Sequence, residues 1–209
     1  MKEHSRAAKP GVREKIVAAA AERFHALGYN ACGVQEIVDA AGVPKGSFYN
    51  YFKAKELLAS EVLNNYWAGA GLDILADKSI APLERLRRHF QHIASRYRKF
   101  GFENGCLVSK FIHEASDSTP LLWKGLRRQA ARWAALIAEA IREGQADGTI
   151  SNSIDAETTA RFLIESWGGV TGAMKLAASR GPIDDFFSVA FGTVLPPGTL
   201  TPRQRKTRS

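Results

Sequence analysis

Hydrogen-bond donors crowd the short segment 45–55, which contains no acidic residue. They are Lys45, Ser47, Tyr49, Asn50, Tyr51, Lys53 and Lys55. Lysine and asparagine can donate to base edges in the major groove, and hydroxyl groups can donate to bases or to phosphates. Phe48 and Phe52, four positions apart, are free to anchor the same helix to a core. A small buried face under a donor-rich surface is typical of a helix that reads DNA.

A thiol provides the second candidate chemistry. Cys106 lies in the sequence Asn-Gly-Cys-Leu-Val at the expected start of a short helix, with Lys110 one turn further on. His113 lies near the same face after another turn. A helix N-terminus and neighbouring cations both favour the thiolate, which is the species that attacks electrophiles. The alternative interpretation is that Cys106 is a small buried hydrophobic residue, as most free cysteines are.

A cysteine-dependent enzyme is the main alternative from another class of protein. Cys106 would be its nucleophile and His113 its base, but the sequence offers no glycine-rich oxyanion loop and no carboxylate placed to orient the histidine. Cys32 and Cys106 are too few for a disulfide framework or a zinc site. We therefore expect neither catalysis nor a cofactor or metal.

The donor-rich segment requires a helix-turn-helix unit to present it. Over 34–41 the apolar positions keep a helical period, Gly42 permits a positive φ for a sharp turn, and Pro44 suits the first turn of the next helix. A preceding alanine-rich helix over 12–27 ends at Gly28 and carries an apolar stripe of Ile16, Ala20, Phe24 and Leu27. Three such helices form a head that is too small to be stable without further packing.

The rest of the chain also reads as helices, with no strand pattern. A long connector helix is expected from Lys55 to about Ala76, followed by helices over 82–100, 106–115, 121–144, 156–179 and 183–195. The sequence therefore predicts an all-α protein of about nine helices, with a flexible basic arm at 1–10, a DNA-binding head at 11–56, a sensing and dimerisation domain at 57–195, and a disordered basic tail at 196–209.

Two sets of residues in the body allow two interpretations each. The cations of the helix over 82–100 fall all around it, which favours a solvated face over a second nucleic-acid surface; they are Arg85, Arg87, Arg88, Arg96, Arg98 and Lys99. Large aromatic residues either line an apolar cavity or form plain core, which is the commoner case at helical spacing; they are Trp67, Trp123, Trp133, Trp167, Phe90, Phe111 and Phe162.

The charge distribution separates the ends of the chain from its middle. The net charge of +8 divides into +3 over 1–56 (nine Lys/Arg against six Asp/Glu), +1 over 57–194 and +4 over 195–209. The nearly neutral middle is not built to hold a polyanion, which argues against a nucleic-acid packaging protein. Neither a secretory signal nor an apolar run of about 18 residues is present, so we expect a soluble cytoplasmic protein that binds no membrane.

The run FHALGYNACGVQEIVDAAGVPKGSFYNYFKAKELL, at 24–58, resembles the N-terminal domain of TetR-family transcriptional regulators. The Gly-Tyr after the first helix, the Ala-Gly-Val turn and Gly-Ser-Phe-Tyr-Asn-Tyr-Phe hold a fixed register that a generic three-helix head would not share. The resemblance implies phosphate contacts from Tyr49, Tyr51 and Lys55 beside Gly46, with Lys45, Ser47 and Asn50 the better candidates for base edges. Double-stranded DNA with a palindromic operator is the implied partner.

One position departs from the family pattern. A Thr-Thr or Thr-Ser pair usually precedes the second helix, whereas this chain has Cys32-Gly33. Glycine can occupy the N-cap without a side-chain acceptor, and a hydroxyl that could contact a phosphate is lost. The backbone amides of Gly33 and Val34 remain available to a phosphate.

The body carries a second resemblance. Gly-Cys-Leu at 105–107 and Trp-Gly-Gly with Met-Lys-Leu at 167–176 look like the TetR subgroup that responds to N-ethylmaleimide-type electrophiles, reactive chlorine or acrylate. The resemblance implies that Cys106 is the sensing thiol, that Lys175 can act with it, and that Trp167 belongs to the same site. Reversible binding of an apolar or carboxylate ligand is the alternative, with Lys175 or Lys110 as its cationic partner.

The resemblance also implies a homodimer in which the two penultimate helices form a four-helix interface with their symmetry mates. Gly168, Gly169 and Gly172 fall in one of these helices, where close approach of another helix or a ligand would explain them. Two heads about 34–36 Å apart can read successive major-groove faces. The expectation is a repressor that an inducer, or modification of Cys106, releases from DNA.

Overall fold

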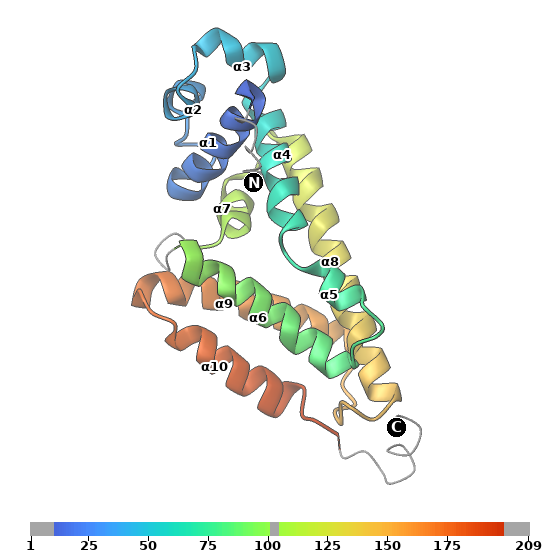
Figure 1. Ribbon diagram of the computed structural model, residues 1–209. Coiled ribbons are helices and arrows are strands. Elements are labelled where there is room, and N and C mark those ends of the chain that lie inside the picture. The colour runs from blue at the N-terminus through green and yellow to red at the C-terminus, as the bar shows by residue number, and fades with distance from the viewer. Residues whose placement is uncertain (1–10, 101–104, 199–209) are drawn as a thin grey trace, which may run out of the picture.

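The computed structural model describes residues 11–100 and 105–198, without the side chains of 98–100. Within these ranges the regular elements are helical apart from one isolated bridge, and none of the helices is long and apolar enough to cross a bilayer. The α-helices (Figure 1) are α1 (Val12–Leu27), α2 (Val34–Ala41), α3 (Lys45–Tyr51), α4 (Lys55–Ala68), α5 (Leu72–Ala76), α6 (Pro82–Phe100), α7 (Leu107–Glu114), α8 (Pro120–Ala146), α9 (Ala156–Ala177) and α10 (Gly181–Val189). A short π-helical turn, Ala190–Val194, follows α10. The predicted all-α fold is confirmed.

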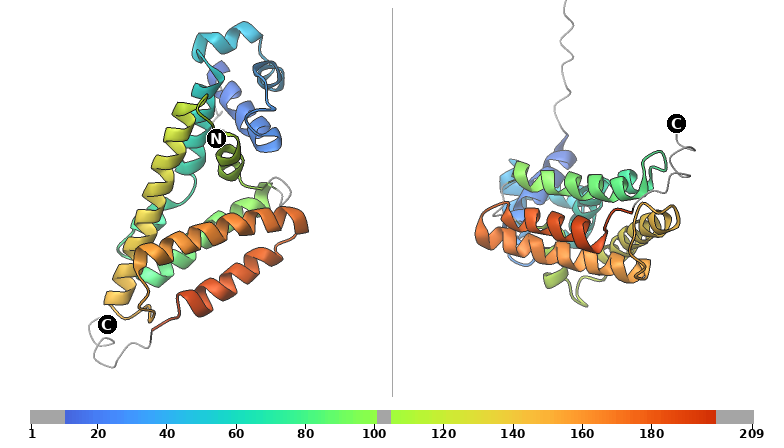
Figure 2. Two further views of the ribbon diagram at one scale, coloured as in Figure 1. Left: turned by 180° about the vertical axis from the view of Figure 1, so that it is seen from behind. Right: turned by 90° about the horizontal axis from the view of Figure 1, so that it is seen from below.

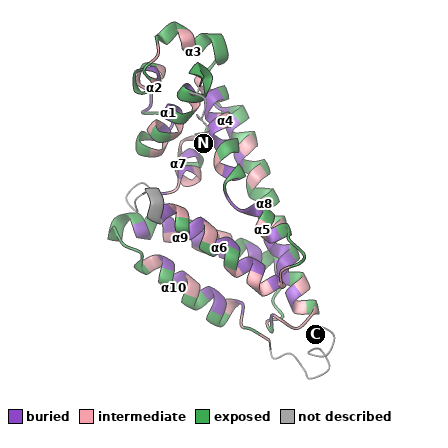
Figure 3. Cartoon of the chain, in the orientation of Figure 1, coloured by how far each residue is buried: buried purple, intermediate pink, exposed green. Residues whose placement is uncertain are grey.

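The helices are arranged as a triangle (Figures 1 and 2). The head, α1 to α3, forms the apex, and α4 and α8 run side by side down one edge. Helices α6, α9 and α10 are layered across the base, and α7 lies between this base and the head. The buried residues form one continuous cluster through head and body, and Figure 3 shows them along the inward faces of the helices.

The head follows its sequence pattern closely. Gly42 ends α2 in the left-handed conformation, with φ of 64°, and the ring of Phe48 is fully buried. The predicted stripe of α1 is wrong at Leu27, which is 40% exposed because the helix ends there and Gly28 turns the chain away with φ of 87°. Phe111 of α7 packs on the head, which meets its need for further packing.

The connector is the main difference from the predicted elements. The helix expected from Lys55 to about Ala76 is broken after Ala68, and Gly71 adopts φ of 68° before α5 begins. A left-handed residue cannot continue an α-helix, and only glycine takes this conformation at low cost. The structure therefore has ten α-helices in its described residues where about nine were predicted.

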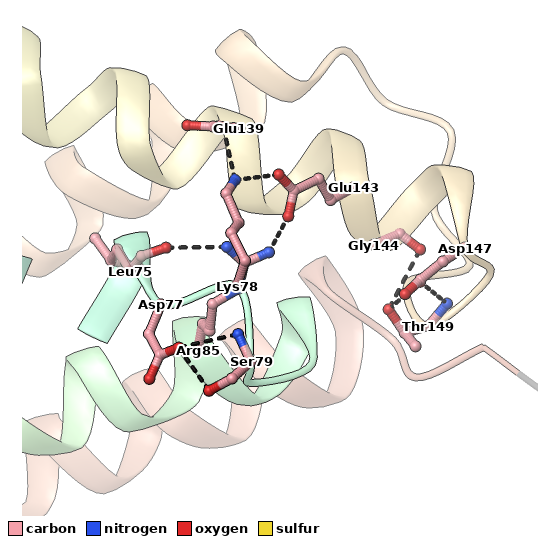
Figure 4. A network of polar contacts seen from close by, with 10 residues as sticks. All are labelled: Leu75, Asp77, Lys78, Ser79, Arg85, Glu139, Glu143, Gly144, Asp147 and Thr149. Carbon is pink, nitrogen blue, oxygen red and sulfur yellow. Dashed lines mark hydrogen bonds and ion pairs between the residues drawn. The ribbon is translucent and has the colours of Figure 1, made fainter. Parts of the chain in front are cut away.

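The prediction of a solvated basic face on α6 is wrong for Arg85. Its side chain is 1% exposed, donates to the carbonyl of Leu75 at 3.1 Å and pairs with Glu143 of α8 (Figure 4). Lys78 bridges the same glutamate and Glu139, at 2.6 Å from the latter. A buried guanidinium requires a carboxylate and carbonyl partners, and here they come from α8 and α5. Arg87 and Arg88 are at least partly exposed as expected.

The ordered part of the body extends slightly beyond residue 195, its predicted limit. Ser151 donates its backbone N–H to Pro196 O at 3.0 Å, and Gly198 donates to Thr149 O at 3.0 Å. Residues 196–198 therefore pair with the α8–α9 loop, where the sequence predicted the start of a disordered tail. The remainder of that tail, the arm at 1–10 and the segment 101–104 lie outside the described residues.

Candidate DNA interface and candidate sensing cavity

The predicted DNA-reading face is open on α3. Tyr49 and Tyr51 are 56% and 47% exposed, and Lys45 and Asn50 are exposed beside them. Ser47 is half-buried, and Phe48 holds the helix to the core from the opposite side. The face therefore presents donors without acidic neighbours on the same helix.

Two glycines leave room at this surface. Gly33 is the N-cap of α2 in an extended conformation, with no side-chain cap bond, as the Cys32-Gly33 departure predicted. A Cβ added at Gly33 or at Gly46 would meet no atom within 4 Å. Gly33 is exposed and Val34 is half-buried, so the start of α2 is accessible to an anion.

Lys55 is used inside the head. Its Nζ donates to the carbonyl oxygens of Tyr29 at 2.7 Å and Cys32 at 3.0 Å, and lies 4.1 Å from the centroid of the Tyr29 ring. The side chain is half-buried, and burial lowers the pKa of this ammonium group. This arrangement differs from the predicted phosphate contact, because the donors already serve two carbonyls that lack helical partners.

A small cavity of about 120 Å³ lies between the connector and the body helices, and Cys106 is part of its wall. Cys106 is the N-cap of α7 and is half-buried. Its Sγ lies 3.7 Å from Tyr66 Oη. Burial raises the pKa of the Tyr66 and Tyr97 phenols, so both remain protonated and can donate to the sulfur. A thiolate formed here would accept these hydrogen bonds.

The cation in the cavity wall is Arg96, not one of the two predicted lysines. Its guanidinium lies 4.2 Å from the centroid of the Tyr66 ring and donates to Tyr66 O at 3.1 Å. Lys110 donates to backbone carbonyls at the end of α1, and Lys175 is exposed. The side chain of Lys175 nevertheless lies close to the segment that carries the thiol. Its Cδ is 3.6 Å from the position that an added Cβ on Gly105, the residue before Cys106, would occupy.

His113 does not take part in the cavity. Its side chain is exposed on α7, whereas Ser109 and Ile112 of that helix contribute to the wall with Cys106. The structure therefore does not bring the predicted nucleophile and base of a cysteine enzyme to one site.

The aromatic residues divide between cavity wall, core and surface. Trp67, Trp133 and Trp167 line the cavity, and the Trp167 ring packs 5.4 Å from that of Phe90. Trp123 and Phe162 are 41% and 50% exposed. Trp133 Nε1 donates to His89 Nε2 at 2.7 Å, and His89 Nδ1 lies 3.1 Å from Gly71 O.

Sequence reasoning missed the residues that α6 contributes to this wall. They are His89, Ile93, Arg96 and Tyr97. Their spacing of 0, 4, 7 and 8 places them on one helical face, and that periodicity was the available signal. Tyr66 of α4 faces them from another part of the chain, which no local pattern indicates.

Comparison with known proteins places both regions in a family. Residues 16–62 match the family described as "Bacterial regulatory proteins, tetR family", and residues 82–190 match "Tetracyclin repressor-like, C-terminal domain". The chain is 34% identical over 192 residues to the HTH-type transcriptional repressor DhaR of Mycobacterium sp. strain GP1, covering 90% of this chain and 95% of the relative. It is 24% identical to the HTH-type transcriptional repressor NemR of Escherichia coli K12, covering 83% and 88%.

Solved structures agree. The regulatory protein TetR from Rhodobacter sphaeroides superposes with a TM-score of 0.76 at 30% identity, covering 85% of this chain and 96% of that one. The reduced form of Escherichia coli NemR gives a TM-score of 0.76 at 22% identity, covering 90% and 100%, and shares the fold.

Proposed function

This chain belongs to the TetR family of transcriptional repressors, and on that premise we propose that it binds a palindromic operator as a homodimer and releases it when a small electrophile modifies Cys106. The exposed, acid-free face of α3 is the observation that carries the DNA-binding part. The position of Cys106 Sγ, 3.7 Å from the Tyr66 hydroxyl in the cavity wall, carries the sensing part.

The exposed hydrogen-bond donors of α3 contact two different parts of the DNA. Tyr49 and Tyr51 hold phosphates, while Lys45, Ser47 and Asn50 face base edges. The amides of Gly33 and Val34 receive a further phosphate at the start of α2, and the open space above Gly46 admits the DNA backbone. Lys55 supports this interface from behind by fixing the start of α4 to the α1–α2 turn.

At Cys106, the chemistry is addition of the thiol to an activated carbon–carbon double bond. The sulfur forms the new S–C bond at one carbon, the π bond breaks, and the neighbouring carbon takes the proton that the thiol lost. The Tyr66 and Tyr97 hydroxyls stabilise the attacking thiolate by hydrogen bonds. No oxidant is needed.

The cavity is small enough for an adduct to disturb its walls. An engineered cavity of about 150 Å³ holds one benzene, so a space of about 120 Å³ accepts roughly six non-hydrogen atoms at most. An adduct of N-ethylmaleimide exceeds this size and displaces the side chains of α4, α6 or α9. The protein then favours a state in which the connector α4 is tilted and the spacing of the heads no longer suits the operator.

A non-covalent carboxylate inducer is the second candidate, and Arg96 is the observation that favours it. Arginine donates to both oxygens of a carboxylate, and Arg96 is the cation that lines the cavity. Acrylate and propionate separate the two candidates, since both carry a carboxylate but only acrylate can add a thiol.

An apolar groove between α9 and α10 supports the homodimer. Phe162 and Val189 line this groove with 50% and 54% exposure, and Leu176 is 92% exposed on the same helix as Phe162. A Cβ added at Gly169 or Gly172 would meet nothing within 4 Å, so their small size serves no contact within the chain. These features favour α9 and α10 as the dimer face, whereas the resemblance implied the two penultimate helices, α8 and α9. Helix α8 is largely occupied by α4, α6 and α9.

The test is a shift assay on the promoter DNA flanking the protein's own gene. We expect the parent protein to bind this DNA and to release it after treatment with N-ethylmaleimide, and Cys106→Ser to bind equally well without release. Cys32→Ser is the matched control and should respond as the parent does, because Cys32 is fully buried in the head.

Different outcomes of this assay distinguish the thiol mechanism from the carboxylate inducer. Release of the Cys106→Ser protein by N-ethylmaleimide would refute the thiol mechanism while leaving the repressor intact. Equal release by propionate and acrylate, retained in Cys106→Ser and lost in Arg96→Met, would establish the carboxylate inducer instead.

A further inference from the structure

A second connection between body and head runs through α7, which begins directly after Cys106. Lys110 Nζ donates to the backbone carbonyls of His25 and Ala26, at 3.1 Å from the latter. Both carbonyls belong to the last turn of α1, which carries the negative end of the helix dipole. A cation from α7 therefore caps the C-terminus of the first head helix.

Glu114, one turn further along α7, makes the complementary contact. Its Oε2 accepts the backbone N–H of Asn30 at 2.6 Å in the turn between α1 and α2. Its Oε1 lies 2.0 Å from where a Cβ on Gly28 would be, so only glycine leaves room for this carboxylate. The Lys110 ammonium group thus contacts carbonyls in the last turn of α1, and the Glu114 carboxylate contacts an N–H of the α1–α2 turn that follows.

Phe111 fills the space between these polar contacts. Its ring is fully buried, with centroids 5.6 Å from Phe24 and 6.3 Å from Tyr29, both in edge-on geometry. Positions 110, 111 and 114 share one side of α7, and all three contact the head. The opposite end of this short helix is Cys106 in the cavity wall.

We propose that Lys110 and Glu114 are positioning residues that fix the angle between head and body, so that α7, together with α4, sets the spacing of the two recognition helices and transmits a change at Cys106 to the head. The sensing half of this inference rests on the proposed function. A rigid helix can carry such a coupling, so a displacement of Cys106, the N-cap of α7, reaches Lys110 and Glu114 and through them the end of α1.

The test removes both charged contacts in the full-length protein, with Lys110→Met/Glu114→Gln. Operator affinity is measured by fluorescence anisotropy before and after N-ethylmaleimide, and alkylation of Cys106 is followed by mass spectrometry. The parent should lose affinity by about 10- to 100-fold on alkylation, a common size for allosteric coupling. The double variant should be alkylated at Cys106 but change affinity by less than about threefold.

A matched control neutralises a surface pair elsewhere, Arg88→Met/Glu84→Gln, whose partners lie 2.6 Å apart on α6. It should respond as the parent does. A Lys110→Met/Glu114→Gln protein that loses affinity as much as the parent would overturn the inference. If the double variant fails to fold, Lys110→Met alone is used in the same test with the same expected results. Lys110→Arg keeps a cation at this position and should respond to N-ethylmaleimide as the parent does.

A second measurement keeps this inference separate from the thiol hypothesis. Operators whose half-sites are moved apart by about 2 base pairs should bind the parent at least tenfold more weakly, but the double variant less than about threefold more weakly. If N-ethylmaleimide does not change the operator affinity of the parent, the thiol hypothesis fails. The preference for half-site spacing then tests the positioning role alone. An unchanged preference in the double variant would then refute the positioning role.

Discussion

At the scale of single residues, His89 joins the wall of the cavity to the turn between α4 and α5. The indole N–H of Trp133 can only donate, so His89 Nε2 accepts it at 2.7 Å, and Nδ1–H donates to Gly71 O at 3.1 Å. The neutral imidazole satisfies both contacts. Burial lowers the pKa of His89 to about 4, which keeps this form at physiological pH.

We expect the free energy of unfolding to fall as the pH decreases from about 6.5 toward 4. A group whose pKa is lowered on folding contributes stability above its unfolded pKa, and this contribution is lost as the pH falls through the folded value. For His89 the difference between about 6.5 and about 4 corresponds to roughly 3 kcal/mol. Urea titrations across this pH range measure the effect.

His89→Gln is the control for that titration. Its amide can accept from Trp133 and donate to Gly71 as the imidazole does, but it does not titrate. The pKa of His25 is also lowered to about 4, mainly by burial, and His25 remains in both proteins, so their difference isolates His89. A glutamine variant that loses stability as steeply as the parent would contradict the assignment.

Tyr49 tests the division between phosphate and base contacts on α3. Tyr49→Phe removes only the hydroxyl, and a hydrogen bond to a charged group contributes about 1.5–3 kcal/mol, so affinity should fall about 10- to 100-fold. The loss should be equal for the operator and for unrelated DNA, because phosphates carry no sequence information. Anisotropy titrations on both DNAs provide the measurement.

Asn50→Ala is the comparison. It should weaken operator binding while leaving binding to unrelated DNA nearly unchanged, since a base contact contributes about 1–3 kcal/mol of discrimination. If both variants reduced specific and non-specific affinity alike, the assignment of Asn50 to a base edge would be wrong.

At the scale of elements, side chains of α6 stabilise the break between α4 and α5. His92 Nε2 contacts Gly69 O at 2.9 Å, and His89 and Arg96 contact the carbonyls of Gly71 and Tyr66. The carbonyls of Tyr66 and Gly69 lie at the end of α4, where helical partners run out, and Gly71 is the N-cap of α5. A ligand that moves α6 therefore acts directly on the end of the connector.

Gly71→Ala should destabilise the protein, because Gly71 has φ of 68° and an added Cβ would lie 2.7 Å from His92 Cδ2. The left-handed conformation alone costs about 1–2 kcal/mol for an L-residue, and the displaced imidazole adds to it. Urea denaturation gives the change in free energy of unfolding.

Gly46→Ala is the opposite case and serves as the control. Gly46 lies inside α3, and a Cβ there meets no atom within 4 Å, so alanine should stabilise by roughly 0.5–1 kcal/mol. Equal and unfavourable effects at both positions would refute the role assigned to the left-handed turn.

At the scale of the whole molecule, the head and the cavity differ in how far the sequence predicts them. The helix-turn-helix depends on local signals, such as Gly42 at its turn and Phe48 under α3, and these place its elements correctly. The cavity joins Tyr66, Arg96 and Cys106 from three helices, so its composition depends on packing over long sequence separations. The position of Lys110 follows from the same packing, which took it away from the thiol and onto α1.

The proposed dimer explains the surface that packing within one chain leaves apolar. Two copies facing each other through α9 and α10 would cover the groove that Phe162 and Val189 line. The exposed positions of Gly169 and Gly172 would allow close approach of helices. The heads lie at the opposite end of each triangle from α10, so the dimer would hold two reading helices apart.

Phe162→Asp should convert the dimer into monomers, because burying an unpaired carboxylate in an apolar interface is strongly unfavourable. The two heads are then no longer joined, so each monomer binds its half-site independently. Operator affinity should therefore fall about 100-fold or more. Sedimentation equilibrium and anisotropy measure the two effects. Ile154→Asp is the control, since Ile154 is 55% exposed but lies in the loop between α8 and α9 and does not line the groove. A dimeric Phe162→Asp protein, or equal loss of dimer in both variants, would exclude the α9–α10 groove as the interface.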